Sequence, residues 1–218
     1  MKSTGQKSQQ KRQQRVGQVV ALFKRHYPNA KCSLSYSNPL ELLVATILSA
    51  QCTDERVNKV TSELFKKYSE VNDYANAPVE ELEEAIHTTG FFRNKAKNIK
   101  SCCQQLREFH GGAVPQNLEA LTQLAGVGRK TAHVVLGNAF NMSSGVVVDT
   151  HVTRLSNRLG FVKGKNAVKI EKELNKLIPK QHWITFSHWL IHHGRNVCRA
   201  RKADCENCFL LDICPQRL

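Results

Sequence analysis

The sequence predicts an all-α protein, and two observations carry that prediction. Apolar residues recur at intervals of three and four almost throughout the chain, which is the pattern of helices with one buried face. The only strand-like run is the short apolar segment Val146-Val147-Val148. No internal repeat is present, so we expect a set of distinct helices.

The first helices are justified by the residues that begin them. Asn38-Pro39 combines a capping residue with a proline suited to a first turn, ahead of an apolar run. Thr53 or Asp54 can cap the second helix, and Pro78 opens a third. The same periodicity predicts further helices at 94–109, 118–124, 129–140, 150–159, 167–178 and 183–193.

The charge balance points to a negatively charged partner. The 218 residues include 32 lysines and arginines against 18 aspartates and glutamates, a formal net charge of +14. A soluble protein with such an excess most often binds nucleic acid. The chain is long enough to bury the core of one large domain or two small ones, which excludes wholesale disorder.

The N-terminus and the apolar runs lack targeting and membrane signals. Residues 1–15 hold five basic residues, no acids and no apolar core, so they are not a secretory signal. They also lack the apolar face of an organellar transit peptide, and we expect a solvated tail. The longest apolar run, Leu40–Ala50, is interrupted by Glu41 and falls short of the roughly 20 residues of a membrane span.

The eight cysteines fall into two groups. Without an export signal, metal ligation or core packing takes precedence over disulfides. Thiolates spaced C-x6-C-x2-C-x5-C in one short segment can converge on a single centre; these residues are Cys198, Cys205, Cys208 and Cys214. Soft sulfur ligands select zinc or an iron–sulfur cluster, and the spacing leaves both open. We expect the others to be small structural residues: Cys32, Cys52, Cys102 and Cys103.

A two-glycine turn joins two of the expected helices. In Leu124-Ala125-Gly126-Val127-Gly128-Arg129-Lys130-Thr131, the glycines permit positive φ and close backbone approach. The N–H groups that begin the second helix can bind one DNA phosphate. A turn of this kind taken alone is more simply a connector between helices.

Two charged residues are candidates for catalysis, each with a simpler alternative. Lys130 taken alone is a solvated cation or a phosphate contact. However, the helix dipole and neighbouring Arg129 would disfavour its protonated form, which makes a lysine usable as a nucleophile. Asp149 follows the apolar run at 146–148 and is either a helix N-cap or a fixed carboxylate that stabilises a cationic centre. The sequence leaves these choices open.

Taken together, these segments resemble the endonuclease III family of DNA glycosylases. The similarity covers roughly residues 20–216 and includes the family's helix–hairpin–helix, its catalytic aspartate segment and its iron–sulfur loop. The matching segments are LSAQCTDERVNK at 48–59, GFFRNKAKNI at 90–99, LAGVGRKTA at 124–132, VVVDTH at 146–151 and the four-cysteine run.

The resemblance implies a two-domain, all-α fold with a [4Fe–4S] cluster on the four C-terminal cysteines. A helical barrel domain is expected at 32–142. The iron–sulfur domain is expected to combine residues 1–31, a basic tail and a first helix, with 143–218. The substrate cleft of the family lies between the two domains, with Lys130 and Asp149 facing each other across it.

The resemblance also implies the activity, a bifunctional DNA glycosylase and abasic-site lyase of base excision repair. Lys130 would displace a damaged base, expected to be an oxidised pyrimidine, and form a Schiff base that allows β-elimination. Asp149 would stabilise positive charge on the sugar. A monomer in the bacterial cytoplasm, associated with the nucleoid, is expected to bind damaged duplex DNA through Gln51, Phe91, Gly126, Val127, Gly128 and Arg129.

Two departures from the family pattern and two rival functions bear on this prediction. Ala125 stands where the family usually has proline, and Phe91 where a leucine wedge is common. Phenylalanine is also an apolar wedge, although the preferred damage can differ. An adenine glycosylase acting on mismatches would lack Lys130 and carry a further domain. A non-catalytic DNA-binding protein would leave Lys130 and Asp149 as coincidences.

Overall fold

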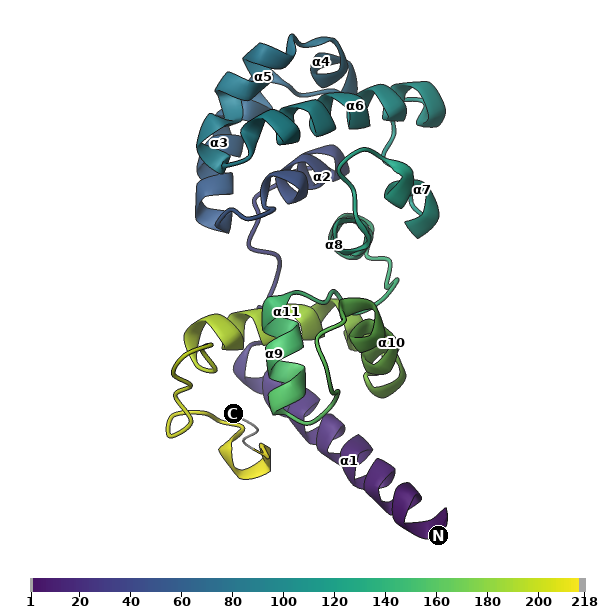
Figure 1. Cartoon of the computed structure of the whole chain (residues 1–218), viewed down its shortest axis with the longest axis vertical. Helices are drawn as coiled ribbons and strands as arrows, with labels where there is room; N and C mark the ends of the chain where they lie inside the picture. Colours follow the sequence, from purple (N-terminus) through teal and green to yellow (C-terminus); the bar gives the residue numbers. More distant parts are fainter. Residues whose placement is uncertain (1, 216–218) are drawn as a thin grey trace. The chain divides into compact units, whose positions relative to one another are not determined.

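The computed structural model describes residues 2–215, with side chains from residue 9 onward (Figure 1). The chain divides into two compact units, one formed by Cys32–Ser144 and one by the N-terminal segment together with the chain from Gly145 onward. Each unit has its own hydrophobic core. The described residues contain helices and no strand, which confirms the all-α class. None of their helices is both long and apolar enough to cross a membrane.

The unit at 32–144 is built around a buried helix, α2 (Pro39–Leu48). Every residue from Leu42 to Leu48 is buried, which is typical of a helix enclosed on all sides. α2 packs against α3 (Asp54–Lys67), α6 (Phe92–His110) and α8 (Arg129–Ala139) (Figure 1). The unit is completed by α4 (Val71–Asn76), α5 (Val79–Ile86), the 3-10 helix η1 (His87–Thr89) and α7 (Leu118–Gln123).

The capping residues predicted for this unit are confirmed. Asn38 Oδ1 accepts a hydrogen bond from the backbone N–H of Glu41 at 2.9 Å, with Pro39 in the first turn of α2. Thr53, rather than Asp54, caps α3. These side chains satisfy backbone donors that have no partner inside the helix.

The other unit consists of α1 (Lys2–His26), α9 (Thr150–Arg158), α10 (Ala167–Leu177) and α11 (Trp183–Asn196), with the 3-10 helices η2 (Lys180–His182) and η3 (Leu211–Ile213). α1 buries one stripe at helical spacing, formed by Val16, Val19, Val20 and Phe23. Phe23 stacks on Trp189 of α11 with ring centroids 6.0 Å apart. Trp189 Nε1 donates to the Tyr27 carbonyl at 3.0 Å, so the N-terminal helix is part of this core.

The segment that we expected to be a solvated tail is helical, because α1 begins at Lys2. Its residues 9–11 are exposed, and the polar residues that follow them attach it to the unit. Gln13 Nε2 donates to the carbonyl of Leu177, the last residue of α10, at 3.0 Å. Arg12 and Arg15 donate at 3.4 Å to the carbonyls of Phe161 and Gly160, just after α9. Carbonyls at helix ends lack intrahelical donors, so these polar side chains attach the segment to the unit.

The strand-like run at 146–148 has no partner strand. Instead, the Val146 N–H donates to Asn175 Oδ1 and the Val147 N–H donates to Ser187 Oγ, both at 2.9 Å. Side chains of α10 and α11 therefore replace the sheet ladder that an extended segment normally needs. This anchoring fixes the backbone immediately before Asp149.

Candidate functional site

The glycine hairpin between α7 and α8 is packed tightly against α6. Gly126 has a φ of +73°, and a Cβ added there would lie 2.8 Å from the Cβ of Asn98. The Ala125 N–H donates to Gln105 Oε1 at 2.7 Å, and Val127 is only 4% exposed. The first glycine is therefore required by both its conformation and its surroundings.

The second glycine and Lys130 lie at the beginning of α8. Gly128 is the N-cap, and no side chain caps the helix. Lys130 is the second residue of α8 and is exposed. A helix start of this kind presents backbone N–H groups and a partial positive charge, which suits a phosphate oxygen.

Gln51 and Phe91 share an uncommon backbone conformation in the same unit. Gln51, in the loop after α2, has a φ of +53°, and Phe91, just before α6, has a φ of +50°. In the described part of the chain, Asn141 is the only other non-glycine residue with a positive φ. Phe91 is 64% exposed. Left-handed backbone costs an ordinary residue free energy and concentrates at functional sites.

Asp149 is the N-cap of α9 in the other unit. Its Oδ1 accepts a hydrogen bond from the Val152 N–H at 2.8 Å, so the capping alternative describes its local role. The side chain is half-buried. Capping engages the carboxylate through one oxygen, so it does not exclude a second role for the negative charge.

His151 lies beside this carboxylate and is kept neutral. Burial lowers its pKa, an effect that the Asp149 charge opposes and that Arg154 and Arg195 reinforce. Arg154 Nη2 lies 3.2 Å from His151 Nδ1 and donates to the Gly194 carbonyl at 2.9 Å. The local charges near Asp149 therefore come from arginine rather than from histidine.

The four C-terminal cysteines line one cavity between α9, α11 and the C-terminal loop. They are Cys198, Cys205, Cys208 and Cys214, all half-buried. Burial raises the pKa of Cys208, and the other three cysteines add to the rise. In residues 2–215, no three histidine, cysteine or acidic side chains are close enough to bind a single metal ion. Four thiolates are the donor set that a [4Fe–4S] cluster takes, so the cysteines that line this cavity have the right kind and number of donors for that group.

Donors from distant parts of the chain point at these sulfur atoms. Arg158 Nη1 donates to Cys198 Sγ at 3.2 Å, and His193 Nε2 lies 3.4 Å from Cys208 Sγ. His193 Nδ1 lies 2.9 Å from the Tyr27 hydroxyl, and burial lowers the pKa of His193 to about 4. A neutral ring that accepts from Tyr27 donates through Nε2 to the sulfur. Such hydrogen bonds stabilise metal-binding thiolates, and sequence spacing contains no signal for them.

Two of the other cysteines are structural, as predicted. Cys102 and Cys103 are buried in α6, and burial raises the pKa of both thiols, that of Cys102 to about 12. Both thiols are therefore protonated at neutral pH and act as small apolar core residues. Cys32 and Cys52 are half-buried.

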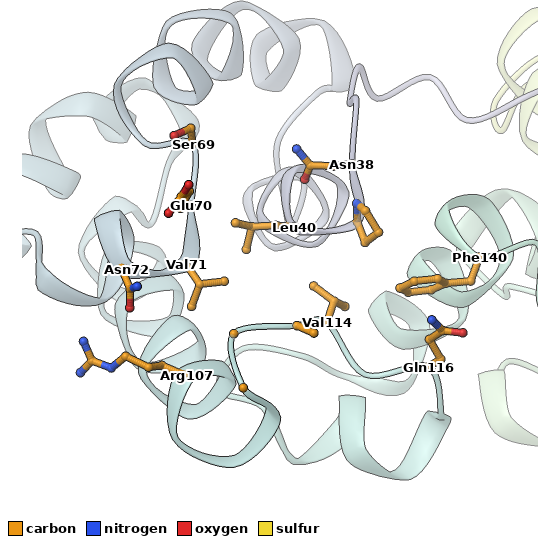
Figure 2. A pocket seen from close by; sticks show the side chains of 14 residues that line it. Asn38, Leu40, Ser69, Glu70, Val71, Asn72, Arg107, Val114, Gln116 and Phe140 are labelled. Atoms are coloured by element: carbon orange, nitrogen blue, oxygen red, sulfur yellow. The ribbon is translucent and has the colours of Figure 1, made fainter.

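A separate pocket of about 560 Å³ lies at the far ends of α2 and α6 from Gln51 and Phe91 (Figure 2). Leu40, at the start of α2, and Val114, beyond the end of α6, line it. α6 has 19 residues, which makes it about 28 Å long. None of the predicted site residues borders this pocket, so it is not part of the candidate site.

Comparison with known proteins agrees with the hairpin and its surroundings. Residues 44–180 match the model of the HhH-GPD superfamily base excision DNA repair protein. The chain is 54% identical to endonuclease III of Synechocystis sp., over 94% of this chain and 93% of that protein. It is 41% identical to the Escherichia coli K12 protein, over 92% and 94% of the two chains.

A solved structure shows the same likeness in three dimensions. It is a trapped endonuclease III–DNA covalent intermediate in an estranged-adenine complex, with a TM-score of 0.89 and 44% identity, covering 94% of this chain and 96% of that chain. The fold and the matched residues define a base excision repair protein of the HhH-GPD superfamily. Within that superfamily, the chain belongs to the endonuclease III family.

Proposed function

We propose that this chain is a bifunctional DNA glycosylase and abasic-site lyase of base excision repair, with Lys130 as its nucleophile. The observation that carries the assignment is the position of Lys130, exposed in the first turn of α8 directly after the hairpin. A nucleophile at this point lies next to backbone donors that bind a phosphate of the same DNA strand. The family relationship supports the same activity.

The proposed chemistry needs one amine and one carboxylate. The neutral Nζ of Lys130 attacks C1′ of the deoxyribose, the glycosidic bond breaks, and the damaged base leaves with the bonding electron pair and takes up a proton. Asp149 stabilises the positive charge that develops on the sugar. The C1′–O4′ bond then breaks as the nitrogen forms a double bond to C1′, and O4′ takes up the proton that the amine gives off. The resulting Schiff base loses a proton from C2′ and expels the 3′ phosphate by β-elimination. Water then releases the lysine.

DNA binding is proposed to use the hairpin and the two left-handed residues. Gly126, Val127, Gly128 and the Arg129 backbone would bind a phosphate at the start of α8. Gln51 and Phe91 would fill the space left by a flipped base, a step that costs least for a damaged and poorly stacked base. Oxidised pyrimidines in duplex DNA are the expected substrates.

The cysteine cavity is proposed to hold a [4Fe–4S] cluster with a structural role. Cys198, Cys205, Cys208 and Cys214 would be its ligands, and the bound cluster would cross-link the C-terminal loop to α11. Neither base displacement nor β-elimination transfers an electron. Basic residues follow the first ligand in the loop, namely Arg199, Arg201 and Lys202, and they would face DNA phosphates.

The proposal extends to domains and location. Residues 32–142 would form the barrel domain, and residues 1–31 with 143–218 the iron–sulfur domain. The division of the chain into compact units between residues 31 and 32 and between residues 144 and 145 supports this proposal. Lys130 belongs to the 32–144 unit and Asp149 to the other, and the proposed mechanism uses both. A monomer in the bacterial cytoplasm, near the nucleoid, is expected, and the bacterial origin of the relatives supports it.

Borohydride trapping on duplex DNA with an abasic site tests the assignment. Reduction converts a Schiff base into a stable protein–DNA adduct, so the unaltered protein should form one and Lys130→Gln should not. Lys169→Gln is the matched control, because Lys169 is an exposed lysine in the first turn of α10. An adduct that survives Lys130→Gln would refute the role of Lys130. No adduct with the unaltered protein would leave a DNA-binding protein without lyase chemistry.

A further inference from the structure

Lys95 is a buried lysine that the proposed chemistry does not use. It lies in the first turn of α6 and is only 5% exposed. Burial lowers its pKa, and the nearby Cys52 thiol opposes that shift. Burying an amine is costly unless hydrogen bonds replace its hydration, so its partners show what keeps it in this position.

The partners are two backbone carbonyls at the ends of two other elements. Nζ donates to the carbonyl of Leu48, the last residue of α2, and to that of Thr89, the last residue of η1, both at 2.8 Å. Carbonyls at helix ends have no donor within their own helix. One nitrogen atom therefore satisfies both and holds the two oxygens side by side.

Each of these carbonyls lies just before a left-handed residue. Gln51 follows Leu48 by three residues, and Phe91 follows Thr89 by two, after Gly90 with a φ of +69°. A left-handed non-glycine residue persists only where its surroundings over-determine the backbone. Lys95 contributes to the surroundings of both Gln51 and Phe91, because its Nζ binds the carbonyl at the beginning of each loop.

We propose that Lys95 is the positioning residue that holds Gln51 and Phe91 at a fixed separation for entry into the DNA. The inference rests on the proposed function, in which both side chains occupy the gap left by one flipped base. Two groups that enter one gap from different loops need a fixed mutual distance, and flexible loops would lose conformational entropy on binding. The hydrogen bonds of Lys95 therefore affect how Gln51 and Phe91 fill the gap in the DNA, and they do not affect the Schiff base chemistry.

The test replaces the amine and measures gap filling directly. Lys95→Met keeps the length of the apolar stem and removes the donors. The probe is a duplex with 2-aminopurine opposite a tetrahydrofuran abasic-site analogue. The emission of 2-aminopurine changes when protein side chains disturb the stacking of this base. Phe91→Ala serves as the reference variant, because it lacks a side chain that is proposed to fill the gap. Ile99→Ala is the matched control, since Ile99 is a buried residue one turn further along α6 and its truncation lowers stability without touching either carbonyl.

We expect Lys95→Met to lose the emission change, as Phe91→Ala does. It should remove a damaged base from duplex DNA about 10- to 100-fold more slowly, because two loop side chains would then lose their freedom on binding. Ile99→Ala should keep the emission change, and Lys95→Met should still form a borohydride adduct with abasic DNA. If Lys95→Met does not fold, Lys95→Gln, whose shorter amide cannot reach both carbonyls, should show the same loss.

Two results would overturn the inference, and they are distinguishable. The first is a normal emission change in Lys95→Met, or in Lys95→Gln if the methionine variant does not fold. This result shows that Lys95 does not position the loops, and the proposed function stands. If the unaltered protein neither changes the emission nor forms an adduct, the proposed function fails together with the role of Lys95.

Discussion

Replacing Gly126 by alanine tests whether the hairpin is held by its packing against α6. A left-handed backbone costs an alanine about 1–2 kcal/mol. The added Cβ would meet the Cβ of Asn98 at 2.8 Å, and because that atom is fixed to the helix backbone, a rotamer change cannot move it. Crowding of this kind costs about 1–3 kcal/mol. We therefore expect Gly126→Ala to lower the free energy of unfolding by about 2–5 kcal/mol.

Gly128→Ala is the matched control for stability, two residues away. Gly128 has a φ of −83°, and a Cβ there meets nothing within 4 Å. Alanine is a poorer N-cap than glycine, but it also reduces the entropy of the unfolded chain, so the net change should stay within about 1 kcal/mol. The contrast between the two glycines is therefore a stronger test than either value alone.

Urea unfolding followed by two signals measures the difference. Both tryptophans, Trp183 and Trp189, lie outside the 32–144 unit, so their fluorescence follows the other unit, while far-UV circular dichroism follows the helices of both. The dichroism midpoint should fall for Gly126→Ala and stay near that of the unaltered protein for Gly128→Ala. Equal losses in the two variants, or a loss under about 1 kcal/mol for Gly126→Ala, would refute the steric reasoning.

Two further predictions concern the other unit. Asp149→Asn should keep α9 capped and change the free energy of unfolding by no more than a few tenths of a kcal/mol, because asparagine caps as well as aspartate. The rate of base removal should nevertheless fall steeply. Full activity in that variant would exclude a role for the charge. Asp149→Ala should in addition lose about 1 kcal/mol in thermal unfolding. The purified protein should be brown with about four irons per chain, and Cys198→Ser should lose iron whereas Cys32→Ser should not. A colourless protein that contains zinc would refute the cluster.

Local sequence signals determined the helices and most of the candidate residues. Asn38 and Thr53 identify helix starts because a cap bonds to backbone only a few residues away. The glycine at 126 indicates a left-handed turn for the same local reason. The cysteine spacing brings four thiols to one short segment, although it does not decide between zinc and an iron–sulfur cluster.

Other features depend on segments that are far apart in the chain. The N-terminal segment has the composition of a tail, but Gln13 bonds to the end of α10, 164 residues away. Likewise, Lys95 bonds to Leu48, 47 residues away, and in the sequence it is one exposed-looking lysine among many.

The sequence by itself therefore determined the helical class, the hairpin and the four candidate sulfur ligands, because caps, glycines and closely spaced cysteines act within a few residues. Only the tertiary structure decided that Lys95 is buried and that His193 and Arg158 point at sulfur atoms. The physical reason is that the role of a polar side chain depends on its hydrogen-bond partner. Folding brings that carbonyl or sulfur atom within about 3 Å from a distant part of the chain, so the residues next to the side chain in the sequence do not indicate it.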